Sequence, residues 1–229
     1  MHVLMHVLGA VLPQNGRLPA PLRVGVTSPA DEEERAWAQL APGTVELAKA
    51  GALPTDASAA PEFYTRTFAE PSLDVHGIAG GSPDLLKTVI PSEASANLSL
   101  RLVPDQAPDS IAANLEALVR QVAPRGAALD IEILGLVPPS RINAEGRPIK
   151  LALDAVEAVT GMRPLFTRWG ASLPVISALT QRGIPTVLTG FAPADGHMHA
   201  PNEWMPLRSL QDAIRAAVAI FAAWGHGLV

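Results

Sequence analysis

The chain contains no cysteine, and this absence excludes several kinds of chemistry. Without a thiol there is no disulfide, no cysteine nucleophile and no thiolate ligand for a metal ion. Aromatic residues are also scarce, at 4%, with a single tyrosine among 229 residues. A metal site in this chain would therefore have to use histidine, aspartate or glutamate side chains as ligands.

Clusters of positive charge and long apolar runs are missing as well. The formal net charge is −5 and no cluster of lysine and arginine occurs, so neither nucleic acid nor an anionic membrane is an expected partner. No apolar run reaches the roughly 18 residues that a membrane span needs. Residues 1–12 are apolar but lack a basic start and a small-residue cleavage site, so they are not interpreted as a signal peptide. With 48% hydrophobic residues, the chain can form a core.

Hydrophobic periodicity predicts the elements of the first 140 residues. Helices are expected over residues 1–12, 31–40, 45–50, 60–68 and 108–122. Alternation of apolar and polar residues predicts strands over residues 71–78, 94–103 and 129–133. The order helix, strand, strand, helix, strand is that of a split βαβ, ferredoxin-like unit that lacks its first strand.

A boundary is expected at residues 137–140, Val-Pro-Pro-Ser, and an α/β pattern follows it. Helices are predicted over residues 148–160, 173–181 and 206–224, and strands over residues 164–167 and 184–188. The last helix is expected to pack one apolar stripe into the core, formed by Leu207, Leu210, Ile214, Val218 and Phe221. The predicted fold is therefore α/β overall, with an α+β domain over residues 1–140 and an α/β part over residues 141–229.

Two stretches carry residues suited to chemistry. Residues 190–204 form a Gly- and Pro-rich loop after a strand, and this loop holds His197 and His199, whose neutral imidazoles are common metal ligands. The alternative is a surface loop whose histidines bind nothing. Arg101 lies on the polar face of a predicted strand among small polar residues, where it can hold a carboxylate with two hydrogen bonds or simply be solvated.

Several motifs in this order resemble one enzyme family. The segments 71–78, 87–91 and 100–104 are similar to the lid, or dimerisation, domain of the carnosinase/aminoacylase-type di-zinc metallopeptidases. Residues 168–174, Arg-Trp-Gly-Ala-Ser-Leu-Pro, resemble that family's Arg-x-Gly-Gly-Ser-Ile-Pro turn. Residues 199–203, His-Ala-Pro-Asn-Glu, resemble its His-Ser/Ala-Pro-Asn-Glu metal motif. The resemblance covers about residues 71 to 205, and the cytosolic dipeptidases look like the closest branch.

The resemblance implies roles for particular residues. His199 would be a zinc ligand, and Arg101 would hold the substrate carboxylate in its own or in a partner subunit's active site. The remaining substrate-binding candidates are His76, Arg168, Gly170, Ala171 and Ser172. Ala171 stands where the family usually has glycine, so its Cβ narrows the turn that would line the C-terminal end of the substrate.

The family's other functional motifs are not found in these 229 residues. They are a His-x-Asp motif, a bridging aspartate and a Glu-Glu pair whose first member is the general base. The only run of glutamates, Glu32 to Glu34, opens a predicted helix, where acids complement the helix dipole. We therefore expect a C-terminal portion of a longer enzyme that lacks its N-terminal catalytic segment, has no catalytic glutamate and is inactive alone.

The resemblance also implies an activity for the intact enzyme. Two Zn²⁺ ions, or other divalent metals, would activate a water molecule that hydrolyses dipeptides or N-acyl amino acids. The implied assembly is a homodimer through the lid domain, and the implied location is the cytoplasm. Two alternatives remain open: a non-catalytic dimerisation or interaction module derived from such an enzyme, and a generic α/β domain whose motif matches are accidental.

Overall fold

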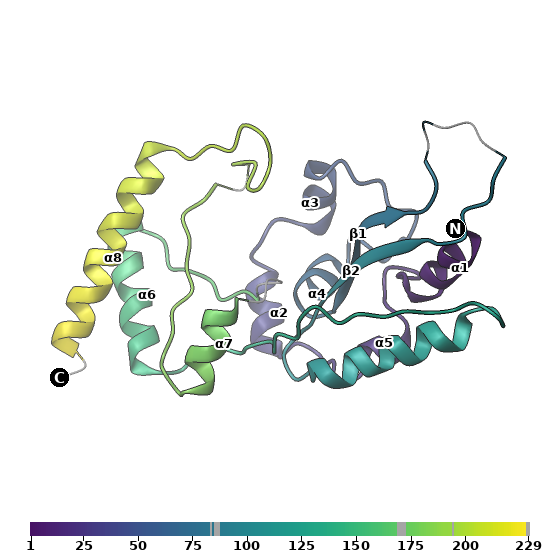
Figure 1. Ribbon diagram of the computed structural model, residues 1–229. Helices are drawn as coiled ribbons and strands as arrows, with labels where there is room; N and C mark the ends of the chain where they lie inside the picture. The colour runs from purple at the N-terminus through teal and green to yellow at the C-terminus, as the bar shows by residue number, and fades with distance from the viewer. Residues whose placement is uncertain (83, 85–87, 169–172, 194, 228–229) are drawn as a thin grey trace. The chain divides into compact units, whose positions relative to one another are not determined.

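The computed structural model describes residues 1–82, 84, 88–168, 173–193 and 195–227. The chain divides into two compact units. Unit 1 comprises Met1–Ser140 together with Thr167–Ser177, and unit 2 comprises Arg141–Phe166 together with Ala178–Val229. Figure 1 shows the elements of both units along the chain.

Unit 1 contains most of the secondary structure. Its elements are α1 (His2–Val11), the 3₁₀ helix η1 (Ala20–Arg23), α2 (Asp31–Trp37), α3 (Gly43–Lys49), α4 (Phe63–Phe68), β1 (Ser72–Ala79), β2 (Ser95–Arg101) and α5 (Pro108–Val122). The helices and the first two strands lie within a few residues of the predicted ranges. This mixture of helices with a small antiparallel sheet confirms the predicted α+β character of the domain.

The sheet of unit 1 is an antiparallel pair, β1 and β2, with Ser72 opposite Arg101 and Leu73 opposite Leu100. Its apolar face packs on a core to which α1 contributes Leu8 and Val11, and α5 contributes Ile111. The two helices therefore cover one face of the sheet (Figure 1). The alternation of the strands leaves polar side chains on the other face.

Three of the predicted strands are wrong, because these segments do not pair with another strand. Residues 129–133, 164–167 and 184–188 are all described, but none of them belongs to a β-ladder. Alternating polarity reports that a segment has two different faces, whereas a strand also requires a neighbour that supplies hydrogen bonds. As a result, apolar side chains of the first segment stay in contact with water, with Ile133 52% exposed.

Helices α2 and α4 share a small aromatic cluster. The rings of Trp37 and Phe68 meet edge to face with centroids 5.5 Å apart, and Tyr64 stacks on Phe68 at 5.4 Å. The Tyr64 hydroxyl donates a 2.7 Å hydrogen bond to the carbonyl oxygen of Ala41. This cluster fixes α2 within unit 1 and therefore positions the acidic residues of its first turn.

Unit 2 is built on two helices, α6 (Arg147–Thr160) and α8 (Leu207–Gly227), which pack against each other (Figure 1). Helix α6 ends as predicted at Gly161, whose φ of 73° places it in the left-handed region that favours glycine. Helix α7 (Pro174–Gln181) begins in unit 1 and ends in unit 2. Within the described ranges, no helix has both the length and the apolar character needed to cross a membrane.

The prediction that the large apolar stripe of α8 packs in the core is wrong. The contact with α6 is made instead by small or opposite-facing residues, among them Ala216 and Ile220. The predicted stripe is exposed to solvent, by 77% at Leu207, 48% at Leu210, 57% at Ile214, 64% at Val218 and 69% at Phe221. Periodicity correctly identified an apolar face, but α6 occupies the alanine-rich side because small side chains let two helices approach closely.

Candidate functional site

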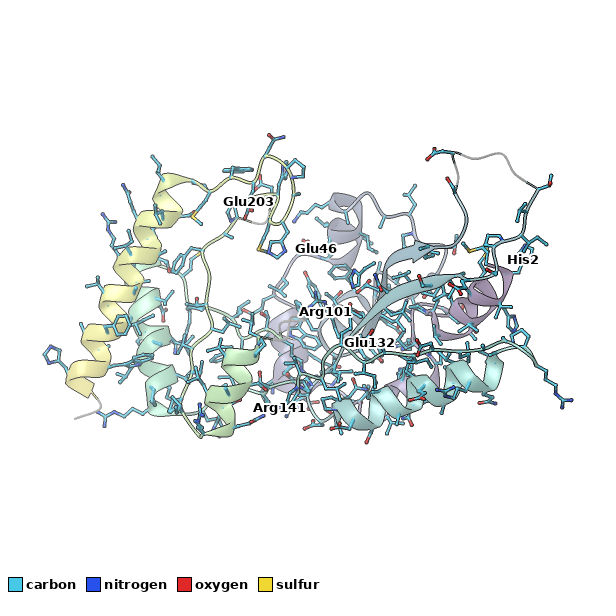
Figure 2. The ribbon with its side chains drawn as sticks, viewed as in Figure 1. His2, Glu46, Arg101, Glu132, Arg141 and Glu203 are labelled. Carbon is cyan, nitrogen blue, oxygen red and sulfur yellow. The ribbon has the colours of Figure 1, made fainter. Side chains whose placement is uncertain are left out.

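The polar face of the β1–β2 sheet brings two of the predicted site residues together. Arg101 is the last residue of β2, and its side chain is exposed (Figure 2). His76 lies on β1 at an irregularity between Val75 and Gly77, where the register with β2 shifts by one residue. A bulge of this kind re-aims a side chain. The remaining polar residues of this face are Ser72, Asp74, Ser95, Asn97 and Ser99.

His76 is held on this face by a serine of the neighbouring strand. Its Nε2 lies 2.6 Å from Oγ of Ser99, and which of the two atoms donates depends on the imidazole tautomer. Ser99 is two residues from Arg101 on the same strand, and alternate residues of a strand share a face. The imidazole and the guanidinium are therefore neighbours along one polar surface.

Arg101 has no acidic partner among the residues that the structure describes. The ion pairs of unit 1 involve other arginines, including Arg17, Arg23, Arg66 and Arg168. A guanidinium that is exposed and unneutralised can accept a carboxylate ligand with two parallel hydrogen bonds. Arg101 is therefore available to bind a carboxylate through two hydrogen bonds, as the sequence analysis predicted.

Arg168 is engaged differently. Its Nε and Nη2 donate to the two carboxylate oxygens of Glu33, at 2.6 and 2.7 Å, and its side chain is 11% exposed. Glu33 also accepts a hydrogen bond from the backbone N–H of Ala30, at 2.8 Å, so the same carboxylate caps the start of α2. The guanidinium of Arg168 is thus committed to a carboxylate of its own chain. The predicted residues Gly170, Ala171 and Ser172 lie outside the described residues.

His199 lies in the loop before α8 and is exposed. The loop is closed by three contacts: the Trp204 N–H donates to the carbonyl oxygen of Gly196 at 3.0 Å, its indole Nε1 donates to that of Asp195 at 3.0 Å, and the Ala200 N–H donates to that of His197 at 2.9 Å. His197, His199 and Asn202 have φ values of 53°, 63° and 61°. Such left-handed conformations are uncommon outside glycine and concentrate at functional sites.

The described residues do not by themselves form a metal site. Within those ranges, no group of three or more histidine, cysteine, aspartate or glutamate side chains is arranged to hold an ion. A zinc ion needs three or four protein ligands, so a single exposed imidazole cannot retain it. His199 is therefore one candidate ligand without companions in the described part of the chain.

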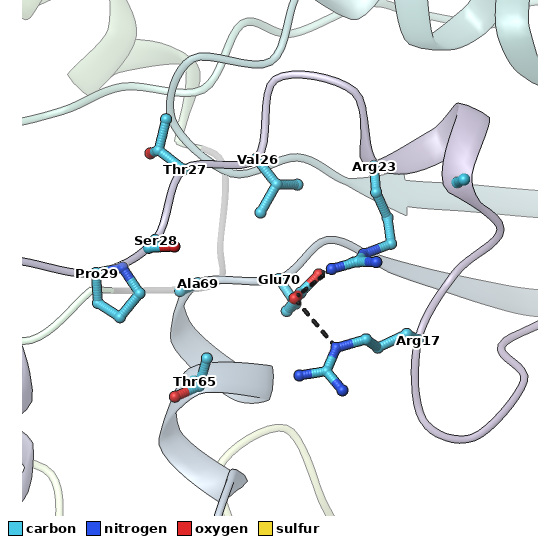
Figure 3. A pocket seen from close by; sticks show the side chains of 10 residues that line it. Arg17, Arg23, Val26, Thr27, Ser28, Pro29, Thr65, Ala69 and Glu70 are labelled. Atoms are coloured by element: carbon cyan, nitrogen blue, oxygen red, sulfur yellow. Dashed lines mark hydrogen bonds and ion pairs between the residues drawn. The ribbon is translucent and has the colours of Figure 1, made fainter.

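A cluster that the sequence did not reveal joins two arginines to Glu70 (Figure 3). Arg23 donates to both oxygens of Glu70 at 2.8 Å, and Arg17 Nε lies 3.3 Å from Oε1. The Glu70 side chain is 10% exposed, and its hydrogen bonds raise the pKa of Arg23 above its usual value. These residues are 47 and 53 positions from Glu70, so no local pattern links them. The cluster ties the loop after α1 to the start of β1.

Unit 1 is thus a helix-covered antiparallel hairpin that presents a polar face with an arginine that has no ion-pair partner in the described part of the chain. Residues 2–127 match the peptidase dimerisation domain family, and the chain belongs to this family. The predicted family resemblance is therefore confirmed.

Relatives of known structure and sequence agree with this assignment. The Cys-Gly metallodipeptidase DUG1 of Saccharomyces cerevisiae is 25% identical over 234 residues, which covers 94% of this chain and 46% of that protein. Its structure, described as the di-peptidase Dug1p, gives a TM-score of 0.81 at 21% identity, covering 98% of this chain and 48% of the other.

Two further solved structures share the fold. The M20 family metallo-carboxypeptidase Sso-CP2 from Sulfolobus solfataricus has a TM-score of 0.83 at 19% identity, covering 97% of this chain and 52% of that one. Human carnosine dipeptidase 1 has a TM-score of 0.75 at 21% identity, and the match covers 97% of this chain and 48% of the human chain. The chain spans about half the length of the relatives it matches.

Proposed function

We propose that this chain is the C-terminal portion of a zinc-dependent dipeptidase or amidohydrolase that acts on dipeptides or N-acyl amino acids. Residues 1–140 would form the lid, or dimerisation, domain, and residues 141–229 would belong to the catalytic domain. The observation that carries the proposal is Arg101, an exposed arginine on the polar face of a peptidase dimerisation domain that has no ionic partner among the described residues. Relatives described as a metallodipeptidase and a metallo-carboxypeptidase support it.

Arg101 would bind the C-terminal carboxylate of the substrate. Its backbone is fixed by the β1–β2 ladder, where it is paired with Ser72, so little backbone freedom is lost when a ligand binds. Two parallel hydrogen bonds set both the position and the plane of the carboxylate. His76, oriented by Ser99, would add a hydrogen bond on the same face. These residues position a substrate but do not carry out the hydrolysis.

His199 would contribute one imidazole to the metal centre. Since the described residues offer no complete ligand set, the other ligands and the general base would come from polypeptide outside this chain. The loop contacts through Trp204 and the left-handed backbone at His199 would fix the direction of the ring. The expected metal is Zn²⁺ or another divalent ion.

The proposal includes a homodimer formed through the lid domain, because the family is defined by peptidase dimerisation. It also includes a cytoplasmic location, on the resemblance to the cytosolic dipeptidases. Both are expectations for the intact enzyme.

The direct test is an assay of Cys-Gly hydrolysis with Zn²⁺ present. The purified chain would be assayed alone and after mixing with the part of the yeast metallodipeptidase that it does not match. We expect no activity alone and activity on mixing, lost in His199→Ala and kept in His197→Ala, a control with the same backbone conformation. Activity of the chain alone would contradict the proposed incompleteness, and an inactive mixture would contradict the enzyme assignment.

A non-catalytic dimerisation module is the second candidate. The observation that favours it is the lack of a metal-binding group among the described residues. It predicts a stable dimer that binds no zinc in either arm of the assay, as measured by metal analysis after gel filtration.

A further inference from the structure

The polar face of the β1–β2 sheet carries an acidic side chain beside Arg101. Asp74 lies on β1 two residues after Ser72, and alternate residues of a strand point to the same face. Because Ser72 is paired with Arg101, Asp74 and Arg101 share this face. Asp74 itself is paired with Ser99, which makes Arg101 its diagonal neighbour, and such neighbours have Cα atoms about 7–8 Å apart. The face therefore presents one negative and one positive side chain within reach of a single small ligand.

Neither charge is neutralised within the described part of the chain. Both side chains are exposed, and no ion pair joins Asp74 or Arg101 to another described residue. By contrast, the carboxylates of Glu62 and Glu70 are bound by arginines of unit 1. An exposed acid and an exposed arginine that do not bind each other are available to a ligand that carries the two opposite charges.

Asp74 determines which ligand fits beside a carboxylate held by Arg101. The rest of such a ligand can extend over the neighbouring positions of the same face, and Asp74 is one of them. A cationic group placed there is attracted by the Asp74 carboxylate, whereas a second carboxylate is repelled. In a dipeptide or an N-acyl amino acid, the group closest to the C-terminal carboxylate is the side chain of the C-terminal residue.

We propose that Asp74 is a specificity-determining residue that selects ligands whose C-terminal residue has a positively charged side chain, such as lysine or arginine. The inference rests on the proposed function, since it takes Arg101 as the group that holds the C-terminal carboxylate. The flexible four-carbon stem of lysine separates its ammonium from its own carboxylate, so the two charges can occupy diagonal positions of the sheet. A neutral C-terminal residue lacks the contact with Asp74, and an acidic one is repelled.

The alternative role for Asp74 is that of a surface charge at the edge of the described sheet. Charged side chains on edge strands keep them from pairing with other chains. A charge with only that role would not change the order in which ligands of different charge bind. The relative affinities of a cationic and a neutral ligand therefore distinguish the two roles.

The test measures ligand binding to the chain itself and does not depend on hydrolysis. Chemical-shift titrations of the ¹⁵N-labelled chain compare Nα-acetyl-lysine with Nα-acetyl-norleucine, which has the same four-carbon side chain without the ammonium. The variants are Asp74→Asn, Asp74→Lys, Arg101→Ala and, as the matched control, Asp109→Asn. Asp109 is an exposed acid in the first turn of α5, the helix that packs on the opposite face of the sheet.

We expect wild type and Asp109→Asn to bind the lysine ligand about two- to fivefold more tightly than the norleucine ligand, as for an exposed ion pair. Asp74→Asn should bind the two ligands equally. Asp74→Lys should reverse the preference and bind Nα-acetyl-glutamate more tightly than the norleucine ligand. Arg101→Ala should weaken the binding of all three ligands, because each of them has the same carboxylate. Added salt should reduce the lysine preference of wild type.

Equal affinity of wild type for the lysine and norleucine ligands would overturn the inference, and so would a lysine preference that persists in Asp74→Asn. In both cases, weaker binding by Arg101→Ala would leave the proposed carboxylate site standing. Absence of binding by every ligand would overturn the inference and the carboxylate site together. A lysine preference that depends on Asp74, in a chain that shows no hydrolysis in the mixed assay, would support the inference and overturn the enzyme assignment alone.

Discussion

Glu33 and Arg168 are 135 residues apart in sequence and share two hydrogen bonds of 2.6 and 2.7 Å. The carboxylate lies in the first turn of α2, and the guanidinium lies at the start of the segment Thr167–Ser177 that belongs to unit 1. Ser177 Oγ adds a second tie by donating to the carbonyl oxygen of Pro138 at 2.9 Å. Thr167–Ser177 follows residues of unit 2 along the chain but belongs to unit 1. The two contacts tie Arg168 and Ser177 of this segment to the rest of unit 1.

Removing the Glu33 carboxylate should loosen this segment. We expect Glu33→Gln to lower the free energy of unfolding by about 1 kcal/mol, because the pair is only partly buried and solvent screens it. Hydrogen exchange should become faster at residues 167 and 168. The control is Glu34→Gln, an exposed neighbour in the same turn. Equal exchange in the two variants would show that the pair does not hold the segment.

Arg101 should determine recognition of the substrate carboxylate. In the mixed enzyme, we expect Arg101→Ala to raise KM for a dipeptide about 10- to 100-fold, which corresponds to the loss of hydrogen bonds to a charged group. The diagnostic readout is a dipeptide whose C-terminus is an amide, for which wild type and variant should have similar KM values. Arg125→Ala, an exposed arginine in the turn after α5, serves as the control. A variant that still prefers the free carboxylate would contradict this role.

The network around Arg66 should make unit 1 sensitive to acid. Hydrogen bonds from Arg66 lower the pKa of Asp56 and of Glu62 below their usual values. A lowered folded-state pKa stabilises the fold above the unfolded value near pH 4, and this contribution is lost as the pH falls through the folded value. Urea midpoints should therefore drop on acidification, and less so in Asp56→Asn/Glu62→Gln.

The matched comparison for this acid effect is Glu116→Gln, which removes an exposed pair with Arg120 on α5. That variant should follow the wild-type acid dependence. If the double variant also followed it, the Arg66 network would not be the source of the pH effect. Because these carboxylates are partly exposed to solvent, added salt should weaken the effect.

Gly196 should be required for the loop that carries His199. A Cβ built on Gly196 would lie 2.9 Å from the carbonyl oxygen of Trp204 and 3.1 Å from that of Pro193, so the backbone would have to shift. We expect Gly196→Ala to speed hydrogen exchange at the Trp204 amide, which donates to Gly196. Gly190→Ala is the control, because a Cβ there meets no atom within 4 Å. Unchanged exchange at Trp204 in both variants would contradict the requirement.

The helices were predicted well, because hydrophobic periodicity and the residues at helix ends can be recognised within a short stretch of sequence. Helix α5 begins at Pro108 and ends at Val122 as expected, and Gly161 ends α6. The segments 129–133 and 184–188, predicted as strands, belong to no β-ladder, since pairing depends on a neighbour that a local pattern does not specify. The pattern also identified the apolar stripe of α8 without showing which face α6 covers.

The candidate site was predictable only where its features depend on local sequence rather than on contacts between distant residues. Alternation along β2 correctly places Arg101 on the polar face, and the motif of residues 199–203 located His199 in a loop before α8. The partner of Arg168 was not predictable, because Glu33 lies 135 residues away and has an obvious local role at a helix start. The bulge at His76 was likewise hidden, since it exists only in the pairing of β1 with β2.

Among the described residues, the sheet of unit 1 has two strands, so each of them is an edge strand and neither is interior. A further strand can pair on either side without breaking any hydrogen bond of the existing ladder. When that strand belongs to the same molecule, the fraction of sheets that have gained a strand does not depend on protein concentration. When the strand belongs to a neighbouring molecule, that fraction rises with protein concentration. Dilution therefore separates growth of the sheet within one molecule from growth between molecules.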